Sequence, residues 1–200
     1  MIASGPGRYG RVMRRRRTSS WIAAVALSVL LAGCGFVNAG GNDQEVPAVP
    51  KPVTLTVTSS AFTDGGAIPA TFTCKGANTS PPLAWSGVPA GSRSVAIVVD
   101  DLDAPGGPYI HWVVYNIDPA QSAISAGEVP QGAQQTLNSG GHVGYTGPCP
   151  SSGTHHYRFT VSVLRSPLTL PADGDPFTVL VAIKGKTTAR GTLTGTVSAG

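Results

Sequence analysis

The sequence predicts a mainly β protein, an antiparallel Greek-key β-sandwich with one or two short helices near the C-terminus. The apolar segments are short and rich in β-branched residues, turn signals of Gly and Pro separate them, and strands do not alternate with long helices. Only 12% of the residues are charged, while 26 are Gly and 17 are Pro. This composition is typical of a turn-rich β domain.

The N-terminal residues 1–33 predict a lipoprotein signal peptide. Residues 1–20 hold six arginines and no acidic residue, and the apolar run 21–31 is too short for a bilayer-spanning helix of about 20 residues. Small residues then precede Cys34, so the segment resembles a bacterial lipobox, in which this cysteine carries a diacylglycerol. Alternatives are an ordinary secretory signal, a start at Met13, and twin-arginine export, for which the motif is poor.

Removal of the signal changes the charge of the chain. The full chain has 14 Lys and Arg against 10 Asp and Glu, and the signal holds six of the arginines, so the remainder has 8 − 10 = −2. No basic run remains, which argues against nucleic-acid binding. We expect residues 34–52 to form a flexible tether and 53–200 to form one domain, lipid-anchored on the extracytoplasmic face of the cell membrane.

The first half of this domain contains the predicted central hairpin. Residues 53–58 alternate apolar residues with threonine, as in a strand with one buried face, and 70–74 show the same alternation. A short strand over 83–86 precedes two apolar, β-branched runs, 95–99 and 110–117. The Gly and Pro residues between these runs require a turn, so the runs are predicted to pair as a hairpin.

The second half begins with a long loop and ends with a helix. Residues 118–145 are poor in large apolar groups, and 155–164 alternate as a further strand. Asp175 and Pro176 suit the N-cap and first position of a helix that runs through Ile183. Over 181–197 glycines interrupt both the helical and the strand periodicity, so no element is assigned there.

Polar side chains at the ends of the central strands form the candidate site. Asp101 and Asp103 follow the run 95–99, His111 begins the next strand, and the strand over 155–164 brings His155 and Tyr157. Imidazoles and a tyrosine hydroxyl can donate hydrogen bonds to phosphoryl oxygens, and an aspartate can hold a histidine in one tautomer. The alternatives are an Asp-capped polar turn beside satisfied core groups and, less favoured, a divalent metal site.

The cysteines also contribute to this region. If Cys34 carries lipid, Cys74 and Cys149 remain as an even pair, and an exported protein favours a disulfide between them. Such a bond would join the loops that flank the candidate site. Two separate buried thiols are the alternative, and zinc binding lacks close Cys and His spacing.

Three motifs closely resemble the phosphatidylethanolamine-binding protein family, in its bacterial Raf kinase inhibitor-like branch. These are D-L-D-A-P with H-W-V-V-Y-N (101–105, 111–116), G-P-C-P with G-T-H-H-Y (147–150, 153–157), and the segment 73–85. They occur in the family's order, and the resemblance covers residues 53 to about 198. It implies a β-sandwich with a small pocket for phosphate, phosphoryl head groups or carboxylates.

The resemblance also implies a set of ligand-binding residues. Carried over by position, these are Asp101, Asp103, Pro105, His111, Gly147, Pro148, His155 and Tyr157. The sequence departs from the family pattern at Leu102, where proline is usual, and at His156, where arginine is usual. The second departure removes a fixed cation near the pocket, although His156 is one residue out of phase with His155 and should face the other side of the sheet.

We therefore expect a membrane-tethered binding protein for a small anionic or phosphorylated ligand such as a phospholipid head group. Neither a metal nor a cofactor is expected. The alternative is an inhibitor or regulator of an envelope protease or signalling protein, which would have a protein partner. A hydrolase is less favoured, because no nucleophile motif occurs and Ser151 and Ser152 show no sign of activation.

Overall fold

The computed structural model describes residues 52–170 and 174–200. The predicted signal peptide, the predicted lipidation site Cys34 and most of the predicted tether lie outside these residues. The elements are β1 (Val53–Thr54), β2 (Thr56–Thr58), the 3-10 turn η1 (Ala70–Phe72), β3 (Leu83–Ser86), β4 (Ser94–Asp101), β5 (Tyr109–Ile117), β6 (Ala123–Ile124), β7 (Gln134–Gln135), β8 (Thr154–Leu164), α1 (Pro176–Lys186) and β9 (Thr187–Ser198).

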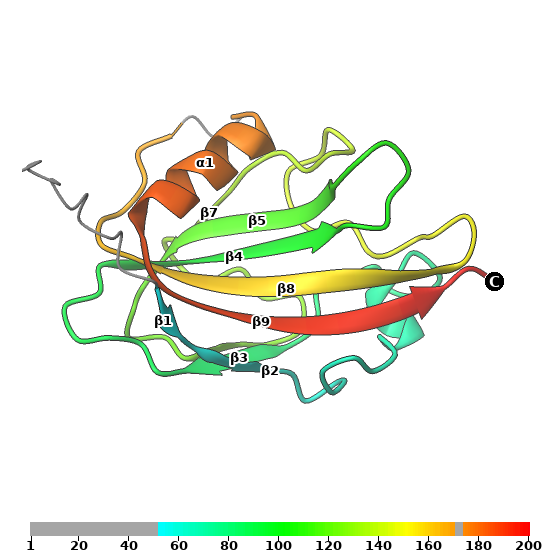
Figure 1. The fold of residues 1–200 in the computed structure, drawn as a ribbon, viewed down its shortest axis with the longest axis horizontal. Coiled ribbons are helices and arrows are strands. Elements are labelled where there is room, and N and C mark those ends of the chain that lie inside the picture. The colour runs from blue at the N-terminus through cyan, green and yellow to red at the C-terminus, as the bar shows by residue number, and fades with distance from the viewer. Residues whose placement is uncertain (1–51, 171–173) are drawn as a thin grey trace, which may run out of the picture. The chain divides into compact units, whose positions relative to one another are not determined.

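The strands form two sheets. A 6-stranded sheet has the order β1-β9-β8-β4-β5-β7, and a 3-stranded sheet has the order β2-β3-β6. All neighbours are antiparallel except β1 and β9, which run parallel. In Figure 1 the long strands β5, β4, β8 and β9 lie side by side, with α1 and the pair β2–β3 on opposite sides. The predicted mainly β sandwich is confirmed.

Both faces of the large sheet are buried at its centre. Every residue of β4 is buried, as the continuous apolar run over 95–99 predicts. Val95, Ile97 and Val99 pack with residues of the small sheet such as Leu83 and Trp85, in the core between the sheets. The alternate residues Ala96 and Val98 face the other way and pack against Val179 and Ile183 of α1.

The helix begins where the sequence predicts. Asp175 is its N-cap, and its Oδ2 accepts a hydrogen bond from the backbone N of Thr178 at 2.9 Å. Pro176 occupies the first turn, where a missing N–H costs no helical hydrogen bond. The helix extends to Lys186, slightly beyond the predicted end at Ile183.

The predicted strand over 70–74 is wrong. Residues Ala70–Phe72 form the 3-10 turn η1, closed by hydrogen bonds from the backbone N and Oγ1 of Thr73 to the Ala70 carbonyl. The alternating pattern A-T-F-T-C fits a strand, but a strand also needs a partner edge. In the structure the backbone N of Cys74 instead bonds to the Pro148 carbonyl at 3.1 Å, in a loop.

The unassigned C-terminal segment 181–197 divides between the end of α1, which reaches Lys186, and the strand β9, which begins at Thr187. Its glycines interrupt the apolar periodicity because the backbone of β9 packs too closely for side chains at these positions. A Cβ at Gly191 would overlap the backbone of Leu55, and a Cβ at Gly195 would overlap the side chains of Ile68 and Phe62. These glycines let the covering segments approach the strand.

Candidate ligand-binding cavity

Three neighbouring strands place polar side chains in one row at the end of the large sheet. Asp101, the last residue of β4, pairs with Tyr109 of β5 on one side and with Tyr157 of β8 on the other. Residues paired across antiparallel strands face the same side of the sheet, and His155 shares that side with Tyr157 two residues later. This side is the inner one, because Tyr157 belongs to the core between the sheets.

A β-bulge brings His111 into the same row. The register between β4 and β5 shifts between Val99, which pairs with Trp112, and Asp100, which pairs with Ile110. His111 is therefore the extra residue on β5, and its ring lies 5.2 Å edge-on from the ring of Tyr157. The bulge thus aims this histidine at the end of the sandwich.

The opposite wall is a loop fixed to the segment after η1. A disulfide joins Cys74 to Cys149, with the two Cα atoms 5.5 Å apart, as the even pair of cysteines predicts. The backbone N of Gly147 donates to Asn78 Oδ1 at 2.7 Å. A Cβ at position 147 would overlap the Asn78 side chain and the backbone of Phe72, so only glycine fits this contact.

These walls enclose a cavity of about 250 Å³. It is lined by Asp101, Ala104, Pro105, Tyr109, His111, Thr146, Gly147, Cys149, Pro150, Ser151, His155 and Tyr157. The structure thus brings together six of the eight residues predicted to bind a ligand: Asp101, Pro105, His111, Gly147, His155 and Tyr157.

Two of the predicted residues, Asp103 and Pro148, do not line the cavity. The β4 strand ends at Asp101, so Asp103 lies beyond it in the turn, where its side chain is 43% exposed. Its carboxylate Oδ2 accepts from the backbone N and from Nδ1 of His156, both at 2.8 Å. The Pro148 carbonyl accepts from the backbone N of Cys74, so this residue supports the wall from behind.

Sequence analysis missed Tyr109 and Thr146, and it considered Ser151 only as a hydrolase serine and not as a residue of the ligand site. Tyr109 could have been found, because it stands two residues before His111, directly before the predicted strand 110–117, and residues two apart on a strand share a face. Its ring centroid lies 4.8 Å from that of His111. Ser151 is four residues from His155 in the sequence, but it and Thr146 lie in a loop without periodicity, so nothing in the sequence assigned either to the cavity wall.

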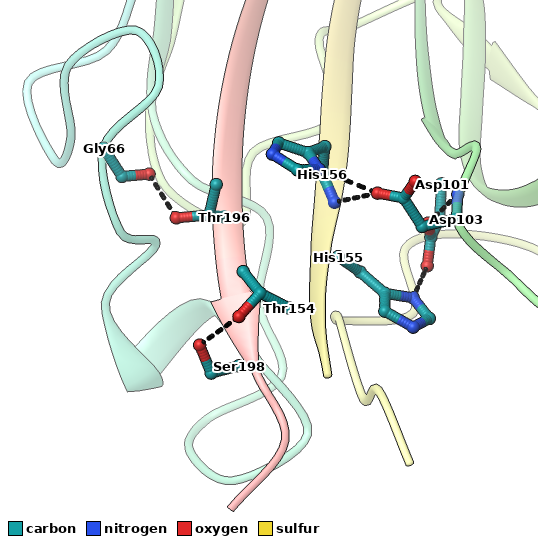
Figure 2. Close-up of polar contacts among 8 residues, drawn as sticks. All are labelled: Gly66, Asp101, Asp103, Thr154, His155, His156, Thr196 and Ser198. Carbon is teal, nitrogen blue, oxygen red and sulfur yellow. Dashed lines mark hydrogen bonds and ion pairs between the residues drawn. The ribbon is translucent and has the colours of Figure 1, made fainter. Parts of the chain in front are cut away.

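The two histidines of the cavity each use Nδ1 for a contact with the protein. His111 Nδ1 donates to the Thr146 carbonyl at 2.7 Å, since a carbonyl oxygen can only accept. His155 Nδ1 lies 2.7 Å from Asp101 Oδ2, as Figure 2 shows. In both rings this leaves Nε2 without a hydrogen-bond partner among the described residues, and hence available to a ligand.

The carboxylate of Asp101 is already satisfied by the protein. Its Oδ2 faces His155, and its Oδ1 accepts from the backbone N of Asp103 at 2.8 Å. With its side chain only 4% exposed, this carboxylate orients His155 and is not free to face a ligand.

Burial sets the protonation of the neighbouring groups. It lowers the pKa of His111, although the hydrogen bond to Thr146 partly opposes this. Burial, followed by the negative charge of Asp101, raises the pKa of Tyr157 well above its usual range, so its hydroxyl stays protonated. The lining includes no Lys or Arg, and Arg158 pairs instead with Asp100 on the other face of the sheet.

The alternative of a metal site gains no support from the described residues. Within 52–170 and 174–200, no three His, Cys, Asp or Glu side chains gather closely enough to hold a metal ion. Asp101 and His155 point their paired atoms at each other, which is the arrangement of a hydrogen-bonded dyad.

Comparison with known proteins settles the family. The model of the family described as phosphatidylethanolamine-binding protein matches residues 58–198, which include the cavity, α1 and both sheets except β1 and most of β2. The chain belongs to the phosphatidylethanolamine-binding protein family. The match includes all three motifs in full and begins at residue 58, slightly after the expected start at residue 53, so the resemblance seen in the sequence is confirmed.

Relatives within this family agree with the assignment. A protein of Mycobacterium tuberculosis named "Putative lipoprotein LppC" is 44% identical over 195 residues, which cover 90% of this chain and 96% of that protein. A UPF0098 protein of Methanothermobacter thermautotrophicus is 40% identical over 146 residues, 70% of this chain and 97% of its own length. The solved structure of E. coli YbcL, titled a member of the mammalian PEBP family, has a TM-score of 0.70 at 31% identity and covers 73% of this chain and 99% of YbcL.

The two departures from the usual family residues lie outside the cavity lining. Leu102 is 48% exposed at the turn after β4. His156 follows His155 on β8, faces the opposite side of the sheet and is exposed. Its side chain pairs with Asp103, so histidine at this position removes no cation from the lining itself.

Proposed function

We propose that the cavity binds a small anion, namely phosphate, a phosphoryl head group or a carboxylate. The observation that carries this proposal is the arrangement of His111 and His155, whose Nδ1 atoms are held by protein acceptors 2.7 Å away. Both rings are thereby fixed with Nε2 available, beside the hydroxyl of Tyr157. A cavity of about 250 Å³ suits a phosphoryl group with a short substituent, while longer chains would remain outside.

Binding of an anion here requires protons. The lining contains no fixed cation, and the charge of Asp101 repels an anion unless His155 is protonated. A protonated His155 neutralises Asp101 and presents Nε2–H to the ligand. A neutral His111 accepts at Nε2 and suits the P–OH group of a phosphate monoanion, whereas a protonated one donates to P–O⁻.

We further propose that the protein acts at the extracytoplasmic face of the cell membrane, held by lipid on Cys34. The lipobox-like segment before this residue supports lipid attachment, as does the similarity to a relative named as a lipoprotein along 90% of this chain. Among residues 52–170 and 174–200, no helix is both long and apolar enough to cross a bilayer.

The proposed activity is binding and not catalysis. Ser151 lines the cavity with the Asp101–His155 pair, which has the form of a general-base dyad. However, within the described part of the chain no hydrogen bond joins Ser151 to His155, which supports binding over a reaction at this hydroxyl. The disulfide-fixed loop that carries Ser151 supports a rigid binding wall.

Calorimetric titration of phosphate, phosphoethanolamine and acetate tests this function. His155→Ala should weaken binding at least about tenfold, because it removes a hydrogen bond to a charged group. His156→Ala is the matched control: it changes the neighbouring histidine, which is exposed and does not line the cavity, and should leave affinity unchanged. Absence of saturable heat with all three ligands near pH 6 would overturn the proposal in favour of a protein partner.

A further inference from the structure

Cationic side chains gather at the end of the domain opposite the cavity. Of the Lys and Arg residues in the described ranges, all but Lys75 and Arg158 lie where β8 and α1 end and where β4 and β9 begin. They are Arg93, Arg165, Lys184, Lys186 and Arg190.

Backbone contacts bring these residues together from four segments. The N of Arg93 donates to the Leu164 carbonyl at 3.1 Å, and the N of the next residue, Arg165, donates to the Lys186 carbonyl at 3.0 Å. Lys184 lies in the last turn of α1. Arg190 lies close to the start of β9, so the loops and strand ends present one basic surface, here called the basic end.

The side chains of the basic end are largely free to meet a partner. Arg93, Arg165, Lys184 and Arg190 are exposed, and none of them forms an ion pair with another described residue. Lys186 is half-buried and donates from Nζ to the Pro167 carbonyl at 2.6 Å.

Acidic residues lie mainly elsewhere. Asp100, Asp101 and Asp103 stand at the opposite end of β4, and Asp175 caps the opposite end of α1. Asp118 is an exception, because it follows Ile117 of β5, which pairs with Val95 at the start of β4, and so lies at the same end of the sheet as the cations; its Oδ1 accepts from the backbone N of Ala120 at 2.9 Å. The domain therefore separates its charges although the chain without its signal has a small net negative charge.

The chain enters the domain at this same end. Val53 of β1 pairs with Ala189, close to the start of β9 and the end of α1. Figure 1 shows these segments at one end of the long strands and the turns around the cavity at the other. The 11 residues of β8 separate the two ends by about 33 Å, at about 3.3 Å per residue.

We propose that the basic end docks on an anionic phospholipid surface, so that the cavity faces away from the bilayer. The orientation rests in part on the proposed lipid on Cys34, because that anchor brings the residues before Val53 to the membrane. The basic end then lies within the electrostatic reach of lipid phosphates, about 8–10 Å at physiological salt. The acyl chains hold the protein, and the cations orient it.

Vesicle sedimentation tests the proposal on residues 34–200 with Cys34→Ser, which carries no lipid. This segment keeps both core clusters and the disulfide, all of which lie within 55–193. Binding to vesicles of phosphatidylcholine mixed with phosphatidylglycerol should exceed binding to phosphatidylcholine alone and should fall with added salt. The triple variant Arg93→Gln/Arg165→Gln/Lys184→Gln should bind the mixed vesicles on the order of a hundredfold more weakly, about fivefold per cation.

A matched pair of single variants tests whether vesicle binding depends on where a cation lies or only on the net charge of the protein. Lys184→Gln and Lys75→Gln remove the same charge from exposed residues at opposite ends, so only Lys184→Gln should weaken vesicle binding about fivefold. Equal effects of the two variants, or equal binding to both kinds of vesicle, would overturn the proposal.

The cavity provides a second, independent test. His155→Ala should bind the mixed vesicles like the unchanged protein while losing phosphate binding. Loss of vesicle binding in His155→Ala would mean that the cavity holds a lipid head group, which would overturn this orientation but support the anion cavity. Thermal unfolding followed by circular dichroism checks that each variant is folded.

Discussion

Two histidine–aspartate pairs stand side by side at the start of β8, and they differ mainly in burial. His155 Nδ1 lies 2.7 Å from Asp101, and His156 Nδ1 lies 2.8 Å from Asp103 (Figure 2). The side chains of the first pair are 11% and 4% exposed, whereas those of the second are 59% and 43% exposed.

The two contact distances are nearly equal, so the difference in burial comes from the position of each pair in the sheet. Burial, and not contact distance, decides whether the aspartate fixes the ring of its histidine. Neighbouring residues of a strand face opposite sides, so His155 lies over the inner cavity and His156 lies in solvent. A buried acceptor is costly to leave unpaired, which fixes the ring of His155. An exposed pair is screened by water and salt, so the His156 pair contributes little beyond the position of the turn.

Breaking the buried pair should have the largest effect. Asp101→Asn removes a buried charge that accepts hydrogen bonds from His155 and from the backbone of Asp103. We expect the free energy of unfolding to fall by about 2–3 kcal/mol, because each hydrogen bond to a charged group is worth about 1.5–3 kcal/mol. Denaturation with urea measures this change, and phosphate titration should show weakened binding.

The matched variant Asp103→Asn completes the test. It makes the same change in the exposed pair, so the urea midpoint and the phosphate affinity should both stay close to those of the unchanged protein. A loss of stability equal to that of Asp101→Asn would contradict the comparison, because burial would then not distinguish the pairs.

The sequence predicts those strands and helices whose local residues are enough to determine them. The apolar run over 95–99 reads as a strand buried on both faces, and Asp175 with Pro176 marks the start of α1. The strand β9 could not be predicted, because its glycines are required by close contacts with Leu55 and Ile68, which pack on the strand from distant parts of the chain. The same limit applies to 70–74, where a plausible strand pattern finds no partner edge.

The candidate site likewise has some features that the local sequence predicts and others that depend on the folded chain. The outward direction of His156 follows from strand alternation alone, and the structure shows it. Spacing by two residues would put Asp103 beside Asp101, but β4 ends at Asp101, and nothing in the sequence fixes the path of the turn beyond it. The bulge at His111 is likewise set by pairing between strands and leaves no local sequence signal.

Lowering the pH should destabilise the protein through His111, the other buried histidine of the cavity. Burial lowers its pKa, so between the ordinary value near 6.5 and its folded value the unfolded chain binds more protons. Stability without ligand should therefore fall as the pH drops below about 6.5, by about 1.4 kcal/mol for each unit by which the pKa is lowered. Urea denaturation from about pH 7 to about pH 5 measures this slope.

A variant that keeps the hydrogen bond but cannot titrate isolates this contribution. His111→Asn retains an N–H donor for the Thr146 carbonyl and should reduce the acid-dependent loss of stability. His142→Asn, in an exposed loop outside the cavity, should leave the slope unchanged. An unchanged slope in His111→Asn would show that this histidine does not carry the effect.

The smallest effect is expected where this sequence departs from its family, at His156. His156→Arg introduces the usual family residue on the exposed face of β8, where it can pair with Asp103 and stays outside the cavity lining. Because solvent screens a charge at this position, phosphate affinity in calorimetric titration should change by less than about threefold. A tenfold gain in phosphate affinity would mean that the introduced guanidinium reaches the ligand around the edge of the strand. The exposed position would then also contribute to ligand binding, contrary to the comparison of the two pairs.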